Sequence, residues 1–152
     1  MLLPGVFLSS RVKSMAGALL TTFGADYLLK FQLGKTLIGG LTCHLFVNPK
    51  VPALADTPAD YVECSLSGYF VAIFTGSAWT GGAVAGVATY MYPTIPFVFD
   101  PYVGALVNIY GYYITNPGYT GVIWAEAFVV PVPVPFTGAS LRLDLTWIDQ
   151  GI

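Results

Sequence analysis

The sequence predicts a mostly β protein: a single-domain β-sandwich or jelly-roll-like fold with one N-terminal helix and an extended N-terminal arm. The chain has 152 residues, a length that suits one domain with one core. Short runs of β-branched and aromatic residues recur between turn signals about every 8–12 residues. Residues 141–148 alternate apolar and polar side chains, the pattern of a strand with one buried face.

The arm is predicted over residues 1–14, and the helix and sandwich domain over residues 15–152. Pro4 and Gly5 oppose an early helix. Residues 15–33 carry apolar side chains at spacings of three and four, which predicts a helix, with Gly34 as its C-cap. The apolar positions of this helix are Leu19, Leu20, Phe23, Tyr27, Leu28 and Phe31.

The first half of the sandwich is predicted from residue 37 onward. Residues 41–47 alternate as a strand, which Asn48-Pro49 ends. Residues 49–60 form a loop, and residues 62–74 carry one or two strands with a bend or bulge at Gly68. A turn over residues 75–82 leads into a strand over residues 83–91.

The second half contains the clearest strand patterns. Strands are predicted over residues 95–99, 106–115 and 122–130, with a turn at residues 116–118. Residues 130–136, VPVPVPF, form an extended edge segment, because proline cannot donate a hydrogen bond to a central ladder. In the last strand one face carries Leu141, Leu143, Leu145 and Trp147, and the other Arg142, Asp144 and Thr146.

The composition indicates surfaces that other molecules cover. Charged residues make up 9% of the chain, against about 25% in an ordinary soluble domain. Hydrophobic residues are 55% and aromatic residues 15%. A monomer rarely leaves large contiguous apolar patches in water, so we expect lipid, a ligand or other chains to cover the excess.

Charge and segment composition argue against two classes of partner. The net charge is −2 and the six basic residues are scattered, which does not suit the phosphates of a nucleic acid. The uncharged stretch 65–99 is interrupted by glycines and prolines, so it does not predict a membrane-spanning helix. A small transmembrane barrel is a minor alternative, and no secretory signal is predicted at the N-terminus.

The sequence predicts no catalytic, cofactor or metal site. His44 is the only histidine, and its neighbour Cys43 points to the opposite face of a strand, so the two do not share a metal ion. We therefore expect His44 to be a strand residue whose ring nitrogens are satisfied. Cys43 and Cys64 are expected as two buried thiols, with a disulfide as the alternative.

Carboxylates are the other candidates for chemistry, since a carboxylate pair can hydrolyse sugars. The simpler interpretation of the acidic residues in loop 49–60, and of Asp100 before Pro101, is that they are solvated turn carboxylates. We expect Glu126 to face outward or to pair with Arg142. The candidate carboxylates are Asp56, Asp60 and Glu63 in the loop, and Asp100 with Glu126.

Aromatic residues are concentrated between residues 110 and 124. Tyrosine and tryptophan form cross-strand pairs and anchor interfaces, and they also stack on sugars. We favour the interface interpretation. The predicted interface residues are Arg11 and Lys13 of the N-terminal arm, together with Tyr110, Tyr112, Tyr119 and Trp124 of the aromatic segment.

Three segments together resemble small structural proteins of tailed-phage virions, including cyanophage ones. They are ADYLLKFQLG leading into LTCHLFVN (25–48), CSLSGYFVAIF (64–74) and NIYGYYITNPGYTGVIWAEAF (108–128), within a similarity that spans roughly residues 25–148. The resemblance implies a trimeric, β-rich capsid cement or decoration protein, or a tail-associated one. It implies a location on the capsid surface, with the major capsid protein and copies of the chain itself as partners.

Three functional hypotheses follow. The first is a non-enzymatic capsid decoration protein that acts as a homotrimer. The second is a receptor- or glycan-binding module of a phage tail or fibre, which uses the aromatic segment and Asp56, Asp60 or Asp100. The third is a hydrolase that uses Asp100 or Glu126, for which the sequence offers no positive signal.

Overall fold

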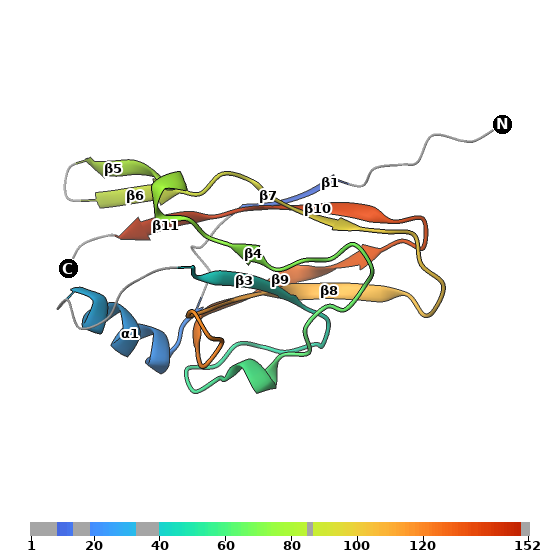
Figure 1. The fold of residues 1–152 in the computed structure, drawn as a ribbon, viewed down its shortest axis with the longest axis horizontal. Helices are drawn as coiled ribbons and strands as arrows, with labels where there is room; N and C mark the ends of the chain where they lie inside the picture. Colours follow the sequence, from blue (N-terminus) through green and yellow to red (C-terminus); the bar gives the residue numbers. More distant parts are fainter. Residues whose placement is uncertain (1–8, 14–18, 33–39, 85–86, 150–152) are drawn as a thin grey trace.

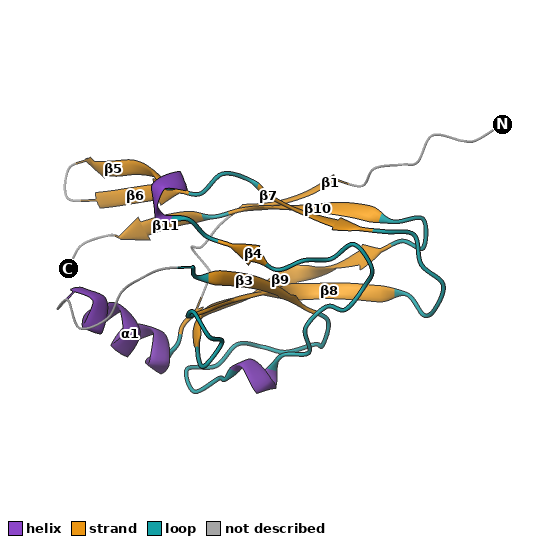
Figure 2. Cartoon of the chain, viewed as in Figure 1, coloured by secondary structure: helices purple, strands orange, loops and turns teal. Residues whose placement is uncertain are grey.

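The computed structural model describes residues 9–13, 19–32, 40–84 and 87–149, as two stacked layers of strands with one α-helix (Figures 1 and 2). Two short 3₁₀ helices, η1 and η2, interrupt the loops. The elements run β1 (Ser9–Lys13), β2 (Leu19–Leu20), α1 (Thr22–Gln32), β3 (Thr42–Phe46), η1 (Pro58–Asp60), β4 (Ala72–Ile73), η2 (Gly76–Ala78), β5 (Thr80–Val84), β6 (Val87–Met91), β7 (Ile95–Phe99), β8 (Val107–Thr115), β9 (Val122–Val134), β10 (Ala139–Asp144) and β11 (Thr146–Asp149).

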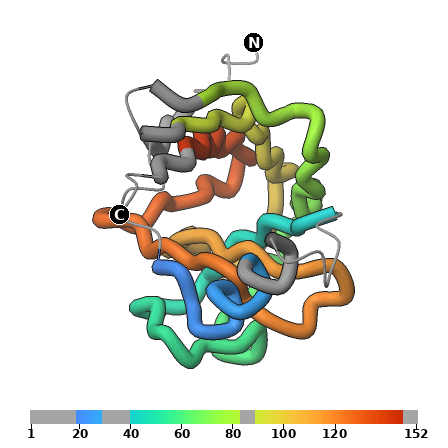
Figure 3. The backbone as a smooth tube through the Cα atoms, turned by 90° about the vertical axis from the view of Figure 1, so that its left-hand side faces the viewer, coloured from blue at the N-terminus to red at the C-terminus, as the bar shows by residue number. Residues whose placement is uncertain are grey.

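The two layers form a β-sandwich-like single domain, as the sequence predicts. One layer is a five-stranded antiparallel sheet in the order β2-β9-β8-β3-β4. The other combines the sheets β1-β10-β7 and β11-β6-β5, and only Leu145 separates β10 from β11. Figure 3 shows the layers facing each other, with α1 and residues 48–63 on the far side of the five-stranded sheet.

The core lies between the layers. Alternate residues of β7 and β10 point inward, so that Phe97 is 1% exposed and Leu143 is 1% exposed, while Val98 and Arg142 face solvent. They meet Cys43 and Leu45 of β3, which are fully buried. Burying such side chains contributes roughly 1.5–3 kcal/mol each, so this alternation fixes which face of each strand turns inward.

The helix begins later than its apolar spacing predicts. Leu19 and Leu20 form β2 and pair with Ala125 and Trp124 of β9, which corrects the predicted start at residue 15. Thr21 then acts as the cap: its Oγ1 accepts a hydrogen bond from the Gly24 amide at 2.9 Å and donates to the Val122 carbonyl. Threonine is a preferred N-cap, whereas the leucine spacing alone does not locate the boundary. The predicted C-cap at Gly34 lies outside the described residues.

Gly24 is a point of close contact between α1 and β9. A Cβ built at this position would lie 2.3 Å from the carbonyl oxygen of Ile123. The glycine, which weakens a helix by its own propensity, is what allows this helix to seat on β9.

The strands at residues 95–99, 107–115 and 122 onward confirm the prediction, and three other segments differ. Residues 62–74 are mostly loop, with only β4 and an isolated bridge between Phe46 and Glu63. The single strand predicted over residues 83–91 is the hairpin β5–β6, which starts inside the predicted turn. The last predicted strand divides into β10 and β11. The predicted extended segment over residues 130–136 is confirmed at Pro131 and Pro133, which lie in the last part of β9, where β8 is its only described neighbour strand.

Part of the predicted arm belongs to the sandwich. Ser9–Lys13 forms β1, which pairs in parallel with β10 through a register that joins Ser9 to Ser140. These residues are therefore a strand and not an irregular arm, and the rest of residues 1–14 lies outside the described residues. No helix in the described part of the chain is long and apolar enough to cross a membrane.

Candidate functional site

The structure separates the four predicted interface aromatics. Tyr112 is fully buried and Trp124 is 7% exposed, so both rings are core residues of this chain and do not lie on its surface. Tyr110 is partly buried and packs against a second apolar cluster on the outer side of the five-stranded sheet. Only Tyr119, in the turn between β8 and β9, is exposed, at 51%. For Arg11 and Lys13 the structure describes the backbone of β1 alone.

Asp100 and Glu126 do not form a carboxylate pair. Asp100 is exposed and accepts a hydrogen bond from the Ser67 hydroxyl at 2.8 Å. Glu126 accepts one from the Tyr112 hydroxyl at 2.8 Å, while Arg142 lies on the outer face of the opposite sheet, which corrects the expected pairing. Burial raises the pKa of Glu126, and the hydrogen bond from Tyr112 opposes that shift.

Asp56 anchors the loop that covers the second cluster, and it is not the solvated carboxylate that the sequence predicts. It is 7% exposed and accepts hydrogen bonds from Lys50 Nζ at 2.8 Å and from the Tyr61 hydroxyl at 2.7 Å. The Ala53 amide supplies a third hydrogen bond. Burial alone would raise the pKa of Asp56, but these hydrogen bonds and the Lys50 charge hold it below its usual value.

His44 projects from β3 toward this loop, on the opposite face from Cys43. Its Nδ1 lies 3.1 Å from Glu63 Oε1, and its Nε2 lies 3.0 Å from Thr115 Oγ1. A carboxylate can only accept, so in the neutral ring Nδ1 carries the proton and Nε2 accepts from the threonine hydroxyl. Both ring nitrogens are satisfied, which confirms the expectation for this residue.

Aromatic rings fix His44 from the side. The imidazole stacks on Tyr113 with centroids 4.7 Å apart, and Tyr113 stacks in turn on Tyr61, also at 4.7 Å. Tyr119 meets the imidazole edge-on at 5.2 Å. Burial, followed by the hydrogen bond to Asp56, raises the pKa of Tyr61, which therefore stays a neutral donor at physiological pH.

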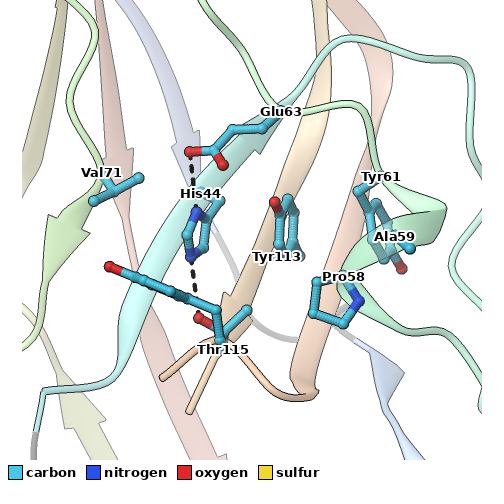
Figure 4. Close-up of a pocket in the computed structure, with 9 residues that line it drawn as sticks. His44, Pro58, Ala59, Tyr61, Glu63, Val71, Tyr113 and Thr115 are labelled. Carbon is cyan, nitrogen blue, oxygen red and sulfur yellow. Dashed lines mark hydrogen bonds and ion pairs between the residues drawn. The ribbon is translucent and has the colours of Figure 1, made fainter. Parts of the chain in front are cut away.

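These side chains line one cavity of about 500 Å³ on the outer side of the five-stranded sheet, which we call the His44 pocket (Figure 4). In Figure 4, Glu63 and Thr115 lie at opposite ends of the imidazole, and Tyr113 and Tyr61 stand beside it. β3, β8, the β3–β4 loop and the β8–β9 turn all contribute to it. Its lining comprises His44, Tyr61, Glu63, Tyr113, Thr115 and Tyr119, with Pro58, Ala59 and Val71 at its sides.

The order carboxylate, imidazole and hydroxyl is also that of a hydrolytic triad, but the burial of the hydroxyl favours another role. Thr115 is 0% exposed, so its oxygen is not placed to attack a substrate carbonyl. The array instead holds the ring of His44 in one orientation. In the described part of the chain, no three His, Cys, Asp or Glu side chains gather as metal ligands.

Tyr119 has an unusual backbone conformation. Its φ of +56° is left-handed, and it is the one described residue other than glycine with a positive φ. Asn116 holds the turn: its carbonyl accepts from the Tyr119 amide at 3.0 Å, and its side chain accepts from the Gly121 amide at 2.9 Å. A left-handed conformation costs a residue with a side chain about 1–2 kcal/mol, and such strain gathers at functional positions.

The sequence did not indicate that these residues meet. Glu63 and Thr115 lie 19 and 71 residues from His44 along the chain. The available signal was the alternation of residues 41–47, which puts His44 and Phe46 on the face away from Cys43. The large apolar side chains near Glu63 then suggest a loop that packs back onto this face.

Exposed apolar side chains form a second feature of the surface. Between the pairs Ile109–Val132 and Gly111–Ala127, residues 128–131 of β9 bulge out opposite Tyr110. Val129 on this bulge is fully exposed and Val130 is 72% exposed. Val103, in the loop between β7 and β8, is also fully exposed, and Phe70 is 81% exposed.

Both cysteines are buried and free, at 0% exposure for Cys43 and 4% for Cys64, so they occur as thiols.

No protein-family model and no curated protein matches this chain, so the function has to be inferred from its residues and their geometry.

Proposed function

We propose that the chain is a non-enzymatic structural protein of a virion, of the capsid cement or decoration type. It contacts the major capsid protein and copies of itself, as a homotrimer on the capsid surface. The observation that carries the proposal is the pair of exposed valines on the β9 bulge, Val129 and Val130. The resemblance of residues 25–148 to tailed-phage structural proteins supports the choice of a phage capsid as the assembly.

The bulge supports a role in contacts between chains. A fully exposed valine forgoes about 1.5 kcal/mol or more that burial would supply. Val129, which is fully exposed, and Val130, which is 72% exposed, are neighbours on the bulge, and β9 pairs with β8 on either side of it. Bulges redirect side chains, and here the redirection is toward solvent. Together with a charged content of 9%, this surface suits a protein whose neighbours cover it.

The test is the mass of the purified chain in solution, by light scattering after size exclusion. We expect three times the single-chain mass of 16.2 kDa. The double variant Val129→Asp with Val130→Asp should give the single-chain mass, because a buried unpaired charge is costly at an interface. Ser65→Asp with Thr137→Asp adds the same charge at exposed positions outside the bulge and should remain trimeric.

Two outcomes would contradict the proposal. One is a wild-type chain that stays monomeric at tens of micromolar and does not co-sediment with undecorated phage capsids. The other is an oligomer whose mass the bulge variant leaves unchanged, which would place the contact surface elsewhere.

A second function, the receptor- or glycan-binding module, is favoured by the His44 pocket. Ligand sites are concave, mostly apolar and equipped with a few oriented polar groups, and they measure about 300–1,000 Å³. The pocket falls in this range, and its walls combine aromatic rings with the Glu63 carboxylate. Binding of the fluorescently labelled chain to a glycan array tests this function, and an array without any bound glycan would eliminate it.

A further inference from the structure

We propose that the His44 pocket takes a small neutral saccharide, with Tyr119 against the ring face and Glu63 accepting from its hydroxyls. This inference rests on the glycan-binding function above. It is independent of whether the chain is a trimer.

The free hydrogen-bonding capacity of the pocket selects for donors. His44 has both nitrogens engaged, and Glu63 Oε1 already receives His44 Nδ1 and the Tyr69 hydroxyl at 3.2 Å. The other oxygen of Glu63, Oε2, accepts no hydrogen bond from any described residue, and the side chain is 40% exposed. A ligand must therefore bring hydrogen-bond donors to this oxygen, and sugar hydroxyls do so.

The charge of the pocket excludes acidic ligands. Among the described residues, its lining contains the Glu63 carboxylate and no lysine or arginine. The nearby Lys50 is already held by Asp56 at 2.8 Å. A sialic acid, a uronic acid or a phosphate would meet this carboxylate without a compensating cation, which is unfavourable at short range.

Tyr119 supplies the apolar contact. Tyr119 is 51% exposed, and its ring sits edge-on to His44 at the pocket, where it can meet a ligand. Aromatic rings pack against the C–H face of a pyranose, which is apolar. The strained φ of +56° would be relieved by glycine, and the aromatic side chain is present nevertheless, which suggests that its position matters more than the strain.

The site is organised before any ligand arrives. The Glu63–His44–Thr115 hydrogen bonds and the stack of Tyr61, Tyr113 and His44 leave these side chains few alternative rotamers. Little conformational entropy is then lost on binding, which compensates for the few contacts a small sugar offers.

The experiment combines a glycan array with calorimetric titration of the highest-ranked neutral oligosaccharide, on the full chain. Tyr119→Gly should weaken binding at least tenfold and leave the thermal midpoint equal or higher, because glycine adopts a φ of +56° without strain. Glu63→Gln should weaken binding severalfold, since an amide oxygen is a poorer acceptor than a carboxylate. Tyr90→Ala removes a 42% exposed tyrosine outside the pocket and should bind like the wild type.

Three results would overturn the inference, and they are distinguishable. A neutral glycan that binds equally well to the Tyr119→Gly variant would show that the site is elsewhere, while the glycan-binding function would stand. A preference for acidic glycans would refute the charge argument. No binding of any glycan by the folded chain would refute both this site and the glycan-binding function.

Discussion

At Asp56, burial and hydrogen bonding act on one carboxylate in opposite directions, and the hydrogen bonds prevail. Its two oxygens accept hydrogen bonds from Lys50, Ala53 and Tyr61, and these bonds hold the loop in place over the second cluster. Because Tyr61 also stacks on Tyr113, the position of Asp56 is transmitted to the wall of the His44 pocket.

The lowered pKa of Asp56 gives its contribution a defined pH dependence. The stabilisation is present above the unfolded pKa of about 3.9 and is lost as the pH falls through the lower folded pKa. We expect Asp56→Asn to reduce the free energy of unfolding by about 1–3 kcal/mol at pH 7, and by less at pH 3. Urea denaturation at both values measures this.

The matched control is the exposed carboxylate of Asp100. Asp100→Asn should change the free energy of unfolding by no more than about 0.5 kcal/mol at pH 7. An Asp56→Asn deficit of equal size at pH 3 and pH 7 would mean that shape, and not charge, is what Asp56 contributes.

Among the elements, α1 depends on close contact more than on its own propensity. Alanine in place of a helix glycine usually stabilises a protein by about 0.5–1 kcal/mol. For Gly24→Ala we expect the reverse sign, a loss of about 1–3 kcal/mol, because the added Cβ would overlap the Ile123 carbonyl. Thermal unfolding followed by circular dichroism measures the change.

Gly76 in η2 provides the comparison. A Cβ at this position meets no atom within 4 Å. Gly76→Ala should therefore be neutral or slightly stabilising. A Gly24→Ala variant as stable as the wild type would show that α1 can move away from β9 at little cost.

The strands also show which structural features local sequence patterns can predict and which they cannot. Alternation predicted β7 and β10 well, because each has one face in the core and one in solvent, as Phe97 and Val98 do. All five residues of β3 are buried, since the second sheet covers one face and the β3–β4 loop the other. Alternation therefore could not reveal that Tyr112 and Trp124 are core residues, nor that His44 lines a pocket. Those facts depend on which distant segments return to the sheet.

For the whole molecule, the sandwich core protects its thiols. Burial raises the pKa of the Cys43 thiol far above its usual range, and the pKa of Cys64 is raised by the same cause. We expect Cys43 in the native chain to react with a disulfide reagent at least about 1,000-fold more slowly than in the denatured chain, because reaction requires global opening. Timed thiol titration with and without denaturant measures this, and rapid native labelling of Cys43 would show that the two layers separate easily.

The pairing of β1 with β10 also affects how the chain acquires its fold. During translation β1 leaves the ribosome before its neighbour in the sheet, because residues 14–138 lie between β1 and β10. The edge of β10 that β1 covers does not exist until residues 139–144 have been made, so this layer of the sandwich can be completed only after the intervening segment has brought the two strands together. Such long-range closure slows folding and leaves strands exposed meanwhile, so we expect this protein to fold slowly and to benefit from chaperones.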